Sequence, residues 1–373
     1  MRILLIGGTG PSGIPIVERL VEHGHDVTIL HRGEHERSET PPDLVHIHAD
    51  PYDEVSFRDS LAEATSGAET TWDVVVAMYG RLRMVASATV GRCDHFVSVG
   101  GVPAYRGWTN AGLHEPAGLP VPVAEDSALV DDPALDEKGY RIVRTEQAVF
   151  AAHPNAAHFR YPYLYGPYQP VPREWTIVRR ILDGRQRIVV ADDGLTLHHH
   201  CYTVNAAAAV VAAVEHRERS AGTIFNIGDA EVLTVRQVVE LCARELGAEI
   251  EIVSMPYELA VPAWPLLAQP SVTHRVLDLT RVHHQLGHRD AVPAREAVGY
   301  TARWLAEHPP ERGGLEEMVL TDPFDYAAED ALMDAWIAAR ASVALPEFAN
   351  PPGFGLAYSG PDGRPRLHAE FAE

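Results

Sequence analysis

The stretch MRILLIGGTGPSGIPIVERLVEHGHDVTILHRG, residues 1–33, decides the fold of this chain. A short apolar run over residues 3–6 stops at the glycine-rich turn of residues 7–13, and an amphipathic segment with apolar side chains at helical spacing follows. A second apolar run, residues 27–30, comes after Gly24, which ends the helix. Strand, tight loop, helix and parallel strand together predict the first unit of a dinucleotide-binding sheet.

The glycines of this turn have a chemical use. Backbone N–H groups at a helix start approach a pyrophosphate closely where no side chain intervenes, and the helix N-terminus adds favourable partial charge. The strand before the turn and the helix after it favour a cofactor site over a merely structural turn. The predicted cofactor-binding residues of the turn are Gly7, Thr9, Gly10, Pro11, Ser12 and Gly13.

Composition limits the classes of function. The 373 residues exceed one typical domain, and 52 acidic against 31 basic side chains give a net charge of -21. This charge disfavours binding to nucleic acid or to an anionic membrane. Three widely spaced cysteines argue against a disulfide framework, and no apolar stretch has the length of a membrane span. We therefore expect a cytoplasmic protein.

Short apolar runs and helical segments continue to alternate after the first unit, at residues 44–47, 73–77 and 95–99. This alternation predicts an α/β fold, a Rossmann-type doubly wound parallel sheet with a smaller C-terminal substrate lobe. The Pro- and Gly-rich segment 102–133 predicts a long loop. The expected parts are residues 1–165, mainly a dinucleotide-binding domain; residues 166–308, mainly a substrate lobe with interleaved elements; and residues 309–373, an extension with a helix over 326–341 and an irregular tail.

Several separated motifs resemble one family. The turn of residues 7–13 is similar to its cofactor fingerprint, and RYPYLYGP, residues 160–167, to its segment beside the nicotinamide. Residues 225–228 and 278–287 are similar to a late strand and to a helix of the substrate lobe. On these motifs the chain resembles the extended short-chain dehydrogenase/reductase family, the NAD-dependent epimerase/dehydratase group, over about residues 1–308.

The resemblance implies a catalytic constellation. It consists of a tyrosine, a lysine four residues later on the same helix face, and a Ser or Thr hydroxyl from the loop after the fifth strand. The lysine lowers the tyrosine pKa, and the tyrosine exchanges a proton with a substrate oxygen while hydride moves to or from the cofactor. Tyr140 lies at the tyrosine position and Arg144 at the lysine position, so these are the predicted catalytic residues.

Two departures from the family pattern concern this constellation. Arg144 can supply positive charge and ribose contacts, but its planar guanidinium differs from a lysine, and the lone lysine, Lys138, has the wrong spacing. Pro103 lies near the position of the hydroxyl and has none. A packed or helix-surface role is therefore the alternative for Tyr140. The alternative hydroxyl donors, among which the sequence does not choose, are Ser98, Tyr105 and Thr109.

The end of the second strand bears on the choice of cofactor. No Asp or Glu occupies positions 30–33, where an acidic side chain would bind the ribose of NAD, whereas Arg32 can pair with the 2′-phosphate of NADP. We therefore predict NADP, with NAD as the alternative. The resemblance implies that Asp50 lies beside the adenine and Tyr163 beside the nicotinamide. A solvated Arg32 and an ordinary loop Asp50 are the alternatives.

Three consecutive histidines, residues 198–200, precede Cys201 and suggest a metal site at first sight. On an extended segment only His198 and His200 share a face, and a closed site needs more ligands, so no metal site is predicted. The resemblance implies that this stretch lies near the substrate. The predicted substrate residues are His198, His200 and Tyr165, against surface histidines and packing tyrosines as alternatives.

These observations predict an NADP-dependent oxidoreductase or epimerase/dehydratase-type enzyme for a small hydroxyl- or carbonyl-bearing substrate, with Tyr140 as acid and base. The family often carries an arginine near residues 198–200, and its absence disfavours a nucleotide sugar. The alternative is a nucleotide-binding protein of the same fold that has lost redox turnover. The resemblance implies a homodimer, and the acidic charge disfavours RNA as a partner.

Overall fold

The computed structural model describes residues 1–33, 40–41, 43–64, 72–78, 81–267, 271–350 and 352. It divides into two compact units, Met1–Phe324 and Asp325–Glu373. The helix predicted in the C-terminal extension is α13 (Tyr326–Ala341), in the second unit, and most of the tail predicted beyond it lies outside the described residues. Within the described ranges, no helix combines the length and the apolar character needed to cross a membrane.

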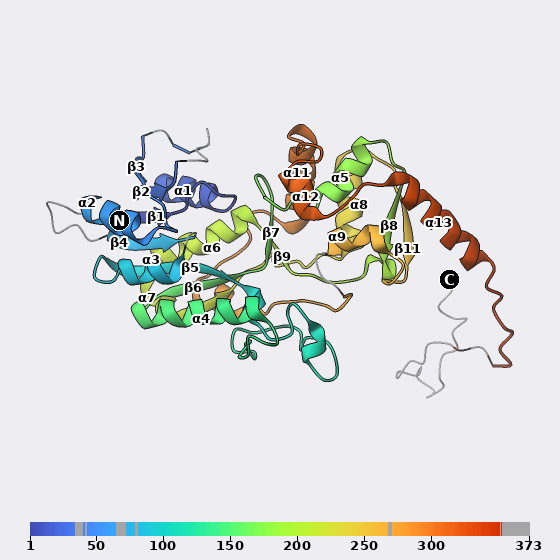
Figure 1. Cartoon of the computed structure of the whole chain (residues 1–373), viewed down its shortest axis with the longest axis horizontal. Helices are drawn as coiled ribbons and strands as arrows, with labels where there is room; N and C mark the ends of the chain where they lie inside the picture. Colours follow the sequence, from blue (N-terminus) through green and yellow to red (C-terminus); the bar gives the residue numbers. More distant parts are fainter. Residues whose placement is uncertain are drawn as a thin grey trace, which may run out of the picture. The chain divides into compact units, whose positions relative to one another are not determined.

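The first unit contains one sheet of seven parallel strands (Figure 1). The spatial order is β10-β6-β5-β4-β1-β2-β3, so the chain starts inside the sheet and later crosses to its other half. Such an order confirms the predicted Rossmann-type fold and places the ligand crevice at the carboxyl ends of the strands. The strands are β1 (Arg2–Ile6), β2 (Asp26–His31), β3 (Val45–His48), β4 (Trp72–Ala77), β5 (Cys93–Gly101), β6 (Ala157–Tyr161) and β10 (Thr223–Asn226).

Helices cover both faces of this sheet, as a doubly wound fold requires. Consecutive strand residues point to opposite faces, so β1 contributes Ile3 and Leu5 to one apolar core and Leu4 and Ile6 to the other. Burial on both faces explains why the strands read as nearly continuous apolar runs. The first core includes α1 (Gly13–Glu22) and α6 (Thr203–Glu215); the second includes α2 (Glu54–Ala64), α3 (Leu82–Ala88) and α4 (Glu137–Ala152).

Two small parallel sheets lie in the rest of the first unit. One pairs β8 (Arg187–Ala191) with β11 (Glu251–Met255), and the other pairs β7 (Tyr163–Tyr165) with β9 (His200–Tyr202). The predicted boundary between residues 1–165 and 166–308 stays a prediction; β10 lies in the large sheet. The longer helices of this part, which pack on one another, are α5 (Trp175–Leu182), α8 (Val235–Glu245) and α11 (Ala294–Glu307).

The predicted long loop after β5 is confirmed, because only two short 3-10 turns interrupt it before α4. They are η1 (Val102–Ala104) and η2 (Ala111–Leu113). The remaining short elements are η3 (Asp192–Gly194), α7 (Arg217–Ser220), η4 (Val261–Ala263), α9 (Trp264–Leu267), α10 (Thr280–Gln285) and α12 (Leu315–Leu320).

Candidate functional site

The glycine-rich turn joins β1 to α1 at the carboxyl end of the sheet. A Cβ on Gly8 would lie 2.6 Å from Leu5 Cδ2, and one on Gly13 would lie 2.7 Å from the Gly8 carbonyl carbon. These two glycines therefore allow the loop and helix to pack on the strand. A Cβ on Gly10 would meet nothing within 4 Å, so the backbone there borders open space. The turn fits a dinucleotide pyrophosphate, which needs tight packing behind the loop and a bare backbone in front.

Short backbone hydrogen bonds hold this turn in place. The Gly7 N–H donates to Leu30 O across 3.0 Å, and the Thr9 N–H donates to Gly7 O across 2.6 Å. Pro11 is half-buried and Ser12 is buried at the start of α1. Tyr161, at the end of β6, is buried, and this burial raises its phenol pKa.

Arg32 and Asp50 lie at one corner, just after the adjacent strands β2 and β3. Arg32 is exposed, and its Cζ lies 6.0 Å from the centre of the Tyr52 ring. Asp50 Oδ1 accepts a hydrogen bond from the Tyr52 N–H at 2.9 Å, which fixes the turn. The structure thus brings together the two residues predicted to contact the adenosine half of a cofactor.

The predicted catalytic residues lie on α4. Asp136 caps this helix by accepting from the Gly139 N–H at 2.8 Å, and a Cβ on Gly139 would lie 2.5 Å from Pro103 O. The start of α4 is therefore held against the end of β5. Tyr140 is half-buried, whereas Arg144 is exposed and donates to Gln147 Oε1 at 2.9 Å.

An open cleft of about 940 Å³ lies beside the other face of α4, near the ends of β3, β4 and β5. Lys138 and Ile142 of α4, four residues apart, line this cleft, whereas Tyr140 and Arg144 are not among its lining residues. Its lining carries more basic than acidic side chains. The lining residues are Tyr52, Arg81, Leu82, Arg83, Met84, Val99, Gly100, Glu137, Lys138, Arg141, Ile142, Thr145 and His158.

A buried polar network lies at the base of this cleft. His158 Nδ1 is 2.7 Å from Ser98 Oγ, and its Nε2 is 3.6 Å from Glu146 Oε1. Arg160 donates to both Glu146 oxygens, across 2.9 Å and 2.8 Å. Burial acts to raise the pKa of Glu146, but the hydrogen bonds from Arg160 and His158 outweigh it and hold this pKa at about 2. Ser98, one of the alternative hydroxyl donors, is fully buried and bonded to His158 in this network.

The predicted substrate residues meet at a second cavity, formed around the small β7-β9 sheet. Its register pairs Tyr163 with His200 and Tyr165 with Tyr202, so segments far apart in sequence lie side by side. The cavity is narrow, about 40 Å³. Its lining includes all three predicted substrate residues: Tyr165, Arg173, Glu174, Thr196, His198, His200, Asp229, Glu231, Val232, Leu233, Val235, Val238, Leu266, Leu267, Ala294 and Val298.

The three consecutive histidines have different roles. His199 is structural, because its Nδ1 accepts from the Leu277 N–H at 3.0 Å and its Nε2 donates to Asp229 O at 2.7 Å. His198 and His200 face the cavity with ring centres 4.8 Å apart. Both ring nitrogens of His198 and Nε2 of His200 lack a hydrogen-bond partner among the described residues. Burial lowers both pKa values, that of His200 to about 3, so these imidazoles are neutral.

Two arginines that sequence reasoning did not assign flank these histidines. Arg173 stacks its guanidinium 4.1 Å from the centre of the Tyr163 ring. Arg275 is buried and donates Nε to Trp108 O at 2.6 Å, while its Nη2 has no partner among the described residues. Both positive charges contribute to lowering the His198 pKa. No local signal identifies these arginines, because only folding brings them to residues 198–200.

Tyr165 closes one side of the cavity through a buried hydrogen bond of 2.7 Å to Asp229 Oδ2. The other Asp229 oxygen accepts from the Tyr202 N–H and from Asn205 Nδ2. Burial raises the pKa of Asp229 to about 6, although these hydrogen bonds oppose the shift. Burial also raises the Tyr165 pKa well above its usual value, so its hydroxyl is a neutral hydrogen-bonding group.

Known proteins match this architecture. Residues 140–228 match the model of the NAD dependent epimerase/dehydratase family. The chain is 29% identical to a 3-diazoavenalumate denitrifying reductase from a Streptomyces species, over 84% of this chain and 99% of the reductase.

Solved structures agree with the fold. A UDP-glucose 4-epimerase from Thermotoga maritima, solved with UDP-glucose, covers 83% of this chain and 100% of its own, with a TM-score of 0.65 and 18% identity. The Bordetella bronchiseptica enzyme WbmG, in complex with NAD, covers 83% and 94%, with a TM-score of 0.62 and 16% identity. The family match over residues 140–228, the similar reductase and the shared fold agree: they support the NAD-dependent epimerase/dehydratase family, the extended short-chain dehydrogenases/reductases, whose typical cofactor is NAD(P).

Proposed function

We propose that this chain is an NADP-dependent oxidoreductase or epimerase-type enzyme whose small hydroxyl- or carbonyl-bearing substrate also carries an anionic group. The glycine-rich turn is the observation that carries the proposal. Gly8 and Gly13 have no room for a Cβ, whereas Gly10 borders open space that a pyrophosphate can occupy. Arg32 would bind the 2′-phosphate, and Asp50 would lie beside the adenine. The bound nicotinamide supplies or accepts the hydride.

The acid-base group in this proposal is Tyr140. Its support is its position directly after Gly139, which packs on the Pro103 carbonyl at the end of β5. The neighbouring Lys138 lines the open cleft and is the natural competitor for the role. Arg144 is exposed and bonded to Gln147. It would supply positive charge to Tyr140 from a longer distance than the lysine that the family has at this position.

Two variants separate these candidates. Tyr140→Phe removes only a hydroxyl, and we expect it to lower kcat by about 10²- to 10⁴-fold, with little change in KM. Lys138→Met is expected to keep turnover within a few-fold of wild type. Full turnover in Tyr140→Phe would refute the assigned role, and simultaneous loss in Lys138→Met would transfer it to the lysine.

The anionic group of the substrate is inferred from the second cavity. Arg173 and Arg275 add two positive charges beside neutral His198 and His200, whose free nitrogens can hydrogen-bond an oxygen-rich ligand. The names of two similar enzymes, the 3-diazoavenalumate reductase and the UDP-glucose epimerase, also denote anionic molecules. A first substrate panel should therefore hold a UDP-sugar and a diazo-bearing carboxylic acid, each with NADPH or NADP.

Once a substrate is found, Arg275→Gln tests the anion site. We expect this variant to raise KM about tenfold or more with a smaller effect on kcat, since the arginine binds but does not react. Arg303→Gln is the matched control, because Arg303 is exposed and pairs with Glu245 outside the cavity lining; it should change neither constant. Equal KM values for Arg275→Gln and wild type would exclude this arginine from substrate binding.

A second candidate function is nucleotide binding without redox turnover. It is favoured by the exposed side chain of Arg144 and by Pro103 at the position of the expected hydroxyl. This candidate predicts stoichiometric NADPH binding and no oxidation of the bound cofactor by any carbonyl compound. Substrate-dependent cofactor oxidation by the wild type, absent in Tyr140→Phe, would exclude it.

A further inference from the structure

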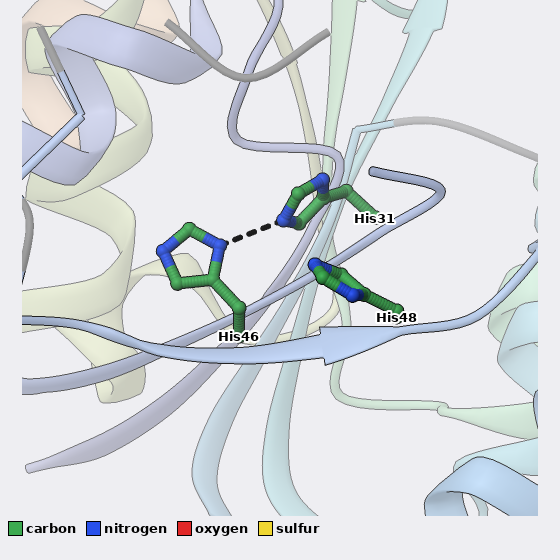
Figure 2. A group of neighbouring side chains, drawn as sticks. All are labelled: His31, His46 and His48. Atoms are coloured by element: carbon green, nitrogen blue, oxygen red, sulfur yellow. Dashed lines mark hydrogen bonds between the residues drawn. The ribbon is translucent and has the colours of Figure 1, made fainter. Parts of the chain in front are cut away.

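Three histidines from two neighbouring strands meet at the edge of the large sheet. His31 is the last residue of β2, and His46 and His48 lie on the edge strand β3. The parallel register pairs Ile29 with His46 and His31 with His48, so all three imidazoles lie on one face. Figure 2 shows the three rings gathered around a common space, which we call the edge histidine cluster.

The spacing of the ring nitrogens is close to that of a metal site. His31 Nε2 and His46 Nδ1 are 2.7 Å apart, and one nitrogen from each ring lies within 4.8 Å of the other two. Three nitrogens bound to one zinc ion at their usual bond length stand about 3.4 Å apart, so small ring rotations suffice. His31 is buried, His46 is half-buried and His48 is exposed, which leaves the cluster open to solvent on one side.

Hydrogen bonding also bears on which ligand the cluster takes. The Gly33 N–H donates to His31 Nδ1 at 3.1 Å, which assigns the proton of the neutral ring to Nε2, where it is shared with His46 Nδ1. Two imidazoles that share one proton are not both cationic, and this disfavours an anion as the ligand. An all-nitrogen set likewise disfavours Mg²⁺ and Ca²⁺, which prefer oxygen.

We propose that His31, His46 and His48 bind a divalent transition-metal ion of the Zn²⁺ class. Neutral imidazole nitrogens suit zinc, copper and nickel, and three of them leave a fourth position that water can reach from the side of exposed His48. The ion takes the place of the proton between His31 Nε2 and His46 Nδ1. That proton moves to His31 Nδ1, which then gives up the hydrogen bond it accepts from the Gly33 N–H and turns to a new acceptor or to solvent. The site is distinct from His198 and His200, which lie on another segment and line the second cavity.

The test is a titration of the full-length, untagged protein with Zn²⁺ alone, after removal of metal with a chelator. Calorimetry gives the stoichiometry, and competition with a chromogenic chelator gives the affinity. The variants are His46→Gln and His48→Gln, since an amide keeps a polar side chain but is a poor zinc ligand. The matched control is His284→Gln, an exposed histidine on α10 outside the cluster.

We expect one Zn²⁺ per chain, bound at least about 100-fold more weakly by each cluster variant and equally well by the His284 control. Circular dichroism verifies that the variants are folded, and exposed His48 provides a variant that leaves the core intact. Absence of zinc binding by the wild type would overturn the proposal. Binding that is unchanged in His46→Gln and His48→Gln would equally overturn it, because one of the other histidines would then hold the metal.

Discussion

The cofactor end and the substrate end of the proposed site are built in different ways. The cofactor end is one contiguous stretch, residues 7–13, in which the backbone and the lack of side chains form the binding surface. The substrate end assembles Tyr163, Arg173, His198 and Arg275 from separate segments. A local backbone pattern can be predicted from the sequence, whereas a cavity formed by residues far apart in the chain cannot. The two ends should therefore respond differently to substitution and to pH.

The largest expected effect concerns the buried ion pair between Glu146 on α4 and Arg160 on β6. Glu146→Ala leaves the fully buried Arg160 without its carboxylate, and we expect a loss of about 3–5 kcal/mol in the free energy of unfolding. Glu137→Ala is the control, because its pair with Arg141 on the same helix is exposed; it should cost less than about 0.5 kcal/mol. Urea denaturation measures both, and similar costs would show that burial of the pair does not matter.

Acid should destabilise the substrate end through its buried histidines. Burial lowers the pKa of His199 to about 4, so this histidine is neutral when folded and takes up a proton on unfolding below about pH 6.5. The neutral histidine therefore contributes its full stabilisation only above the pKa it has in the unfolded chain. As the pH falls from 7 to 5, one such group lowers the free energy of unfolding by about 2 kcal/mol. The raised pKa of Asp229 acts in the opposite direction and offsets part of this loss.

Urea denaturation of His199→Gln at both pH values checks this contribution. Its stability should fall less between pH 7 and pH 5 than that of the wild type, whereas exposed His284→Gln should behave like the wild type. Identical pH dependence in all three proteins would mean that His199 is not held neutral by burial.

At the cofactor end, substitutions of two glycines distinguish a loss of packing from a loss of cofactor binding. Gly13→Ala forces a Cβ against the Gly8 backbone, and we expect a loss of about 2 kcal/mol in stability together with weaker cofactor binding. Gly10→Ala meets no neighbouring atom, so it should keep the wild-type stability and weaken NADPH binding alone. Thermal unfolding and calorimetry measure the two effects. Undiminished NADPH binding by Gly10→Ala would contradict a pyrophosphate at this turn.

The smallest expected effect concerns the preference between cofactors. Arg32→Gln removes the proposed partner of the 2′-phosphate, and we expect about tenfold weaker NADPH binding, with NADH binding unchanged. Equal losses for both cofactors would assign Arg32 a role in general affinity instead of specificity.

Most of the large sheet could be predicted from sequence, because each strand buried on both faces is a short apolar run. The runs at 3–6, 27–30, 44–47, 73–77 and 95–99 correspond to β1 to β5. The helix predicted at residues 326–341 is confirmed as α13, since its spacing of apolar residues is local information. The strands β7 and β9 were not predicted, because three residues give too little periodicity.

The candidate site was less predictable for a physical reason. The sequence predicts substrate residues at His198 and His200, and these two line the cavity, whereas His199 between them has a structural hydrogen bond to Asp229 O. The edge histidine cluster was missed because a shared face depends on the register of β2 and β3, which no single segment reveals. Likewise, the contrast between Lys138, which lines the cleft, and exposed Arg144 depends on how α4 is rotated against the sheet.

The most direct test of the proposed cofactor site is a calorimetric titration of the full-length protein with NADPH and, separately, with NADH. A working cofactor end at residues 7–13, with Arg32 beside it, predicts one NADPH per chain, bound about tenfold more tightly than NADH. Binding of neither nucleotide would contradict the account, since the glycine-rich turn would then be a purely structural connection and the assignment of Tyr140 would lose its basis.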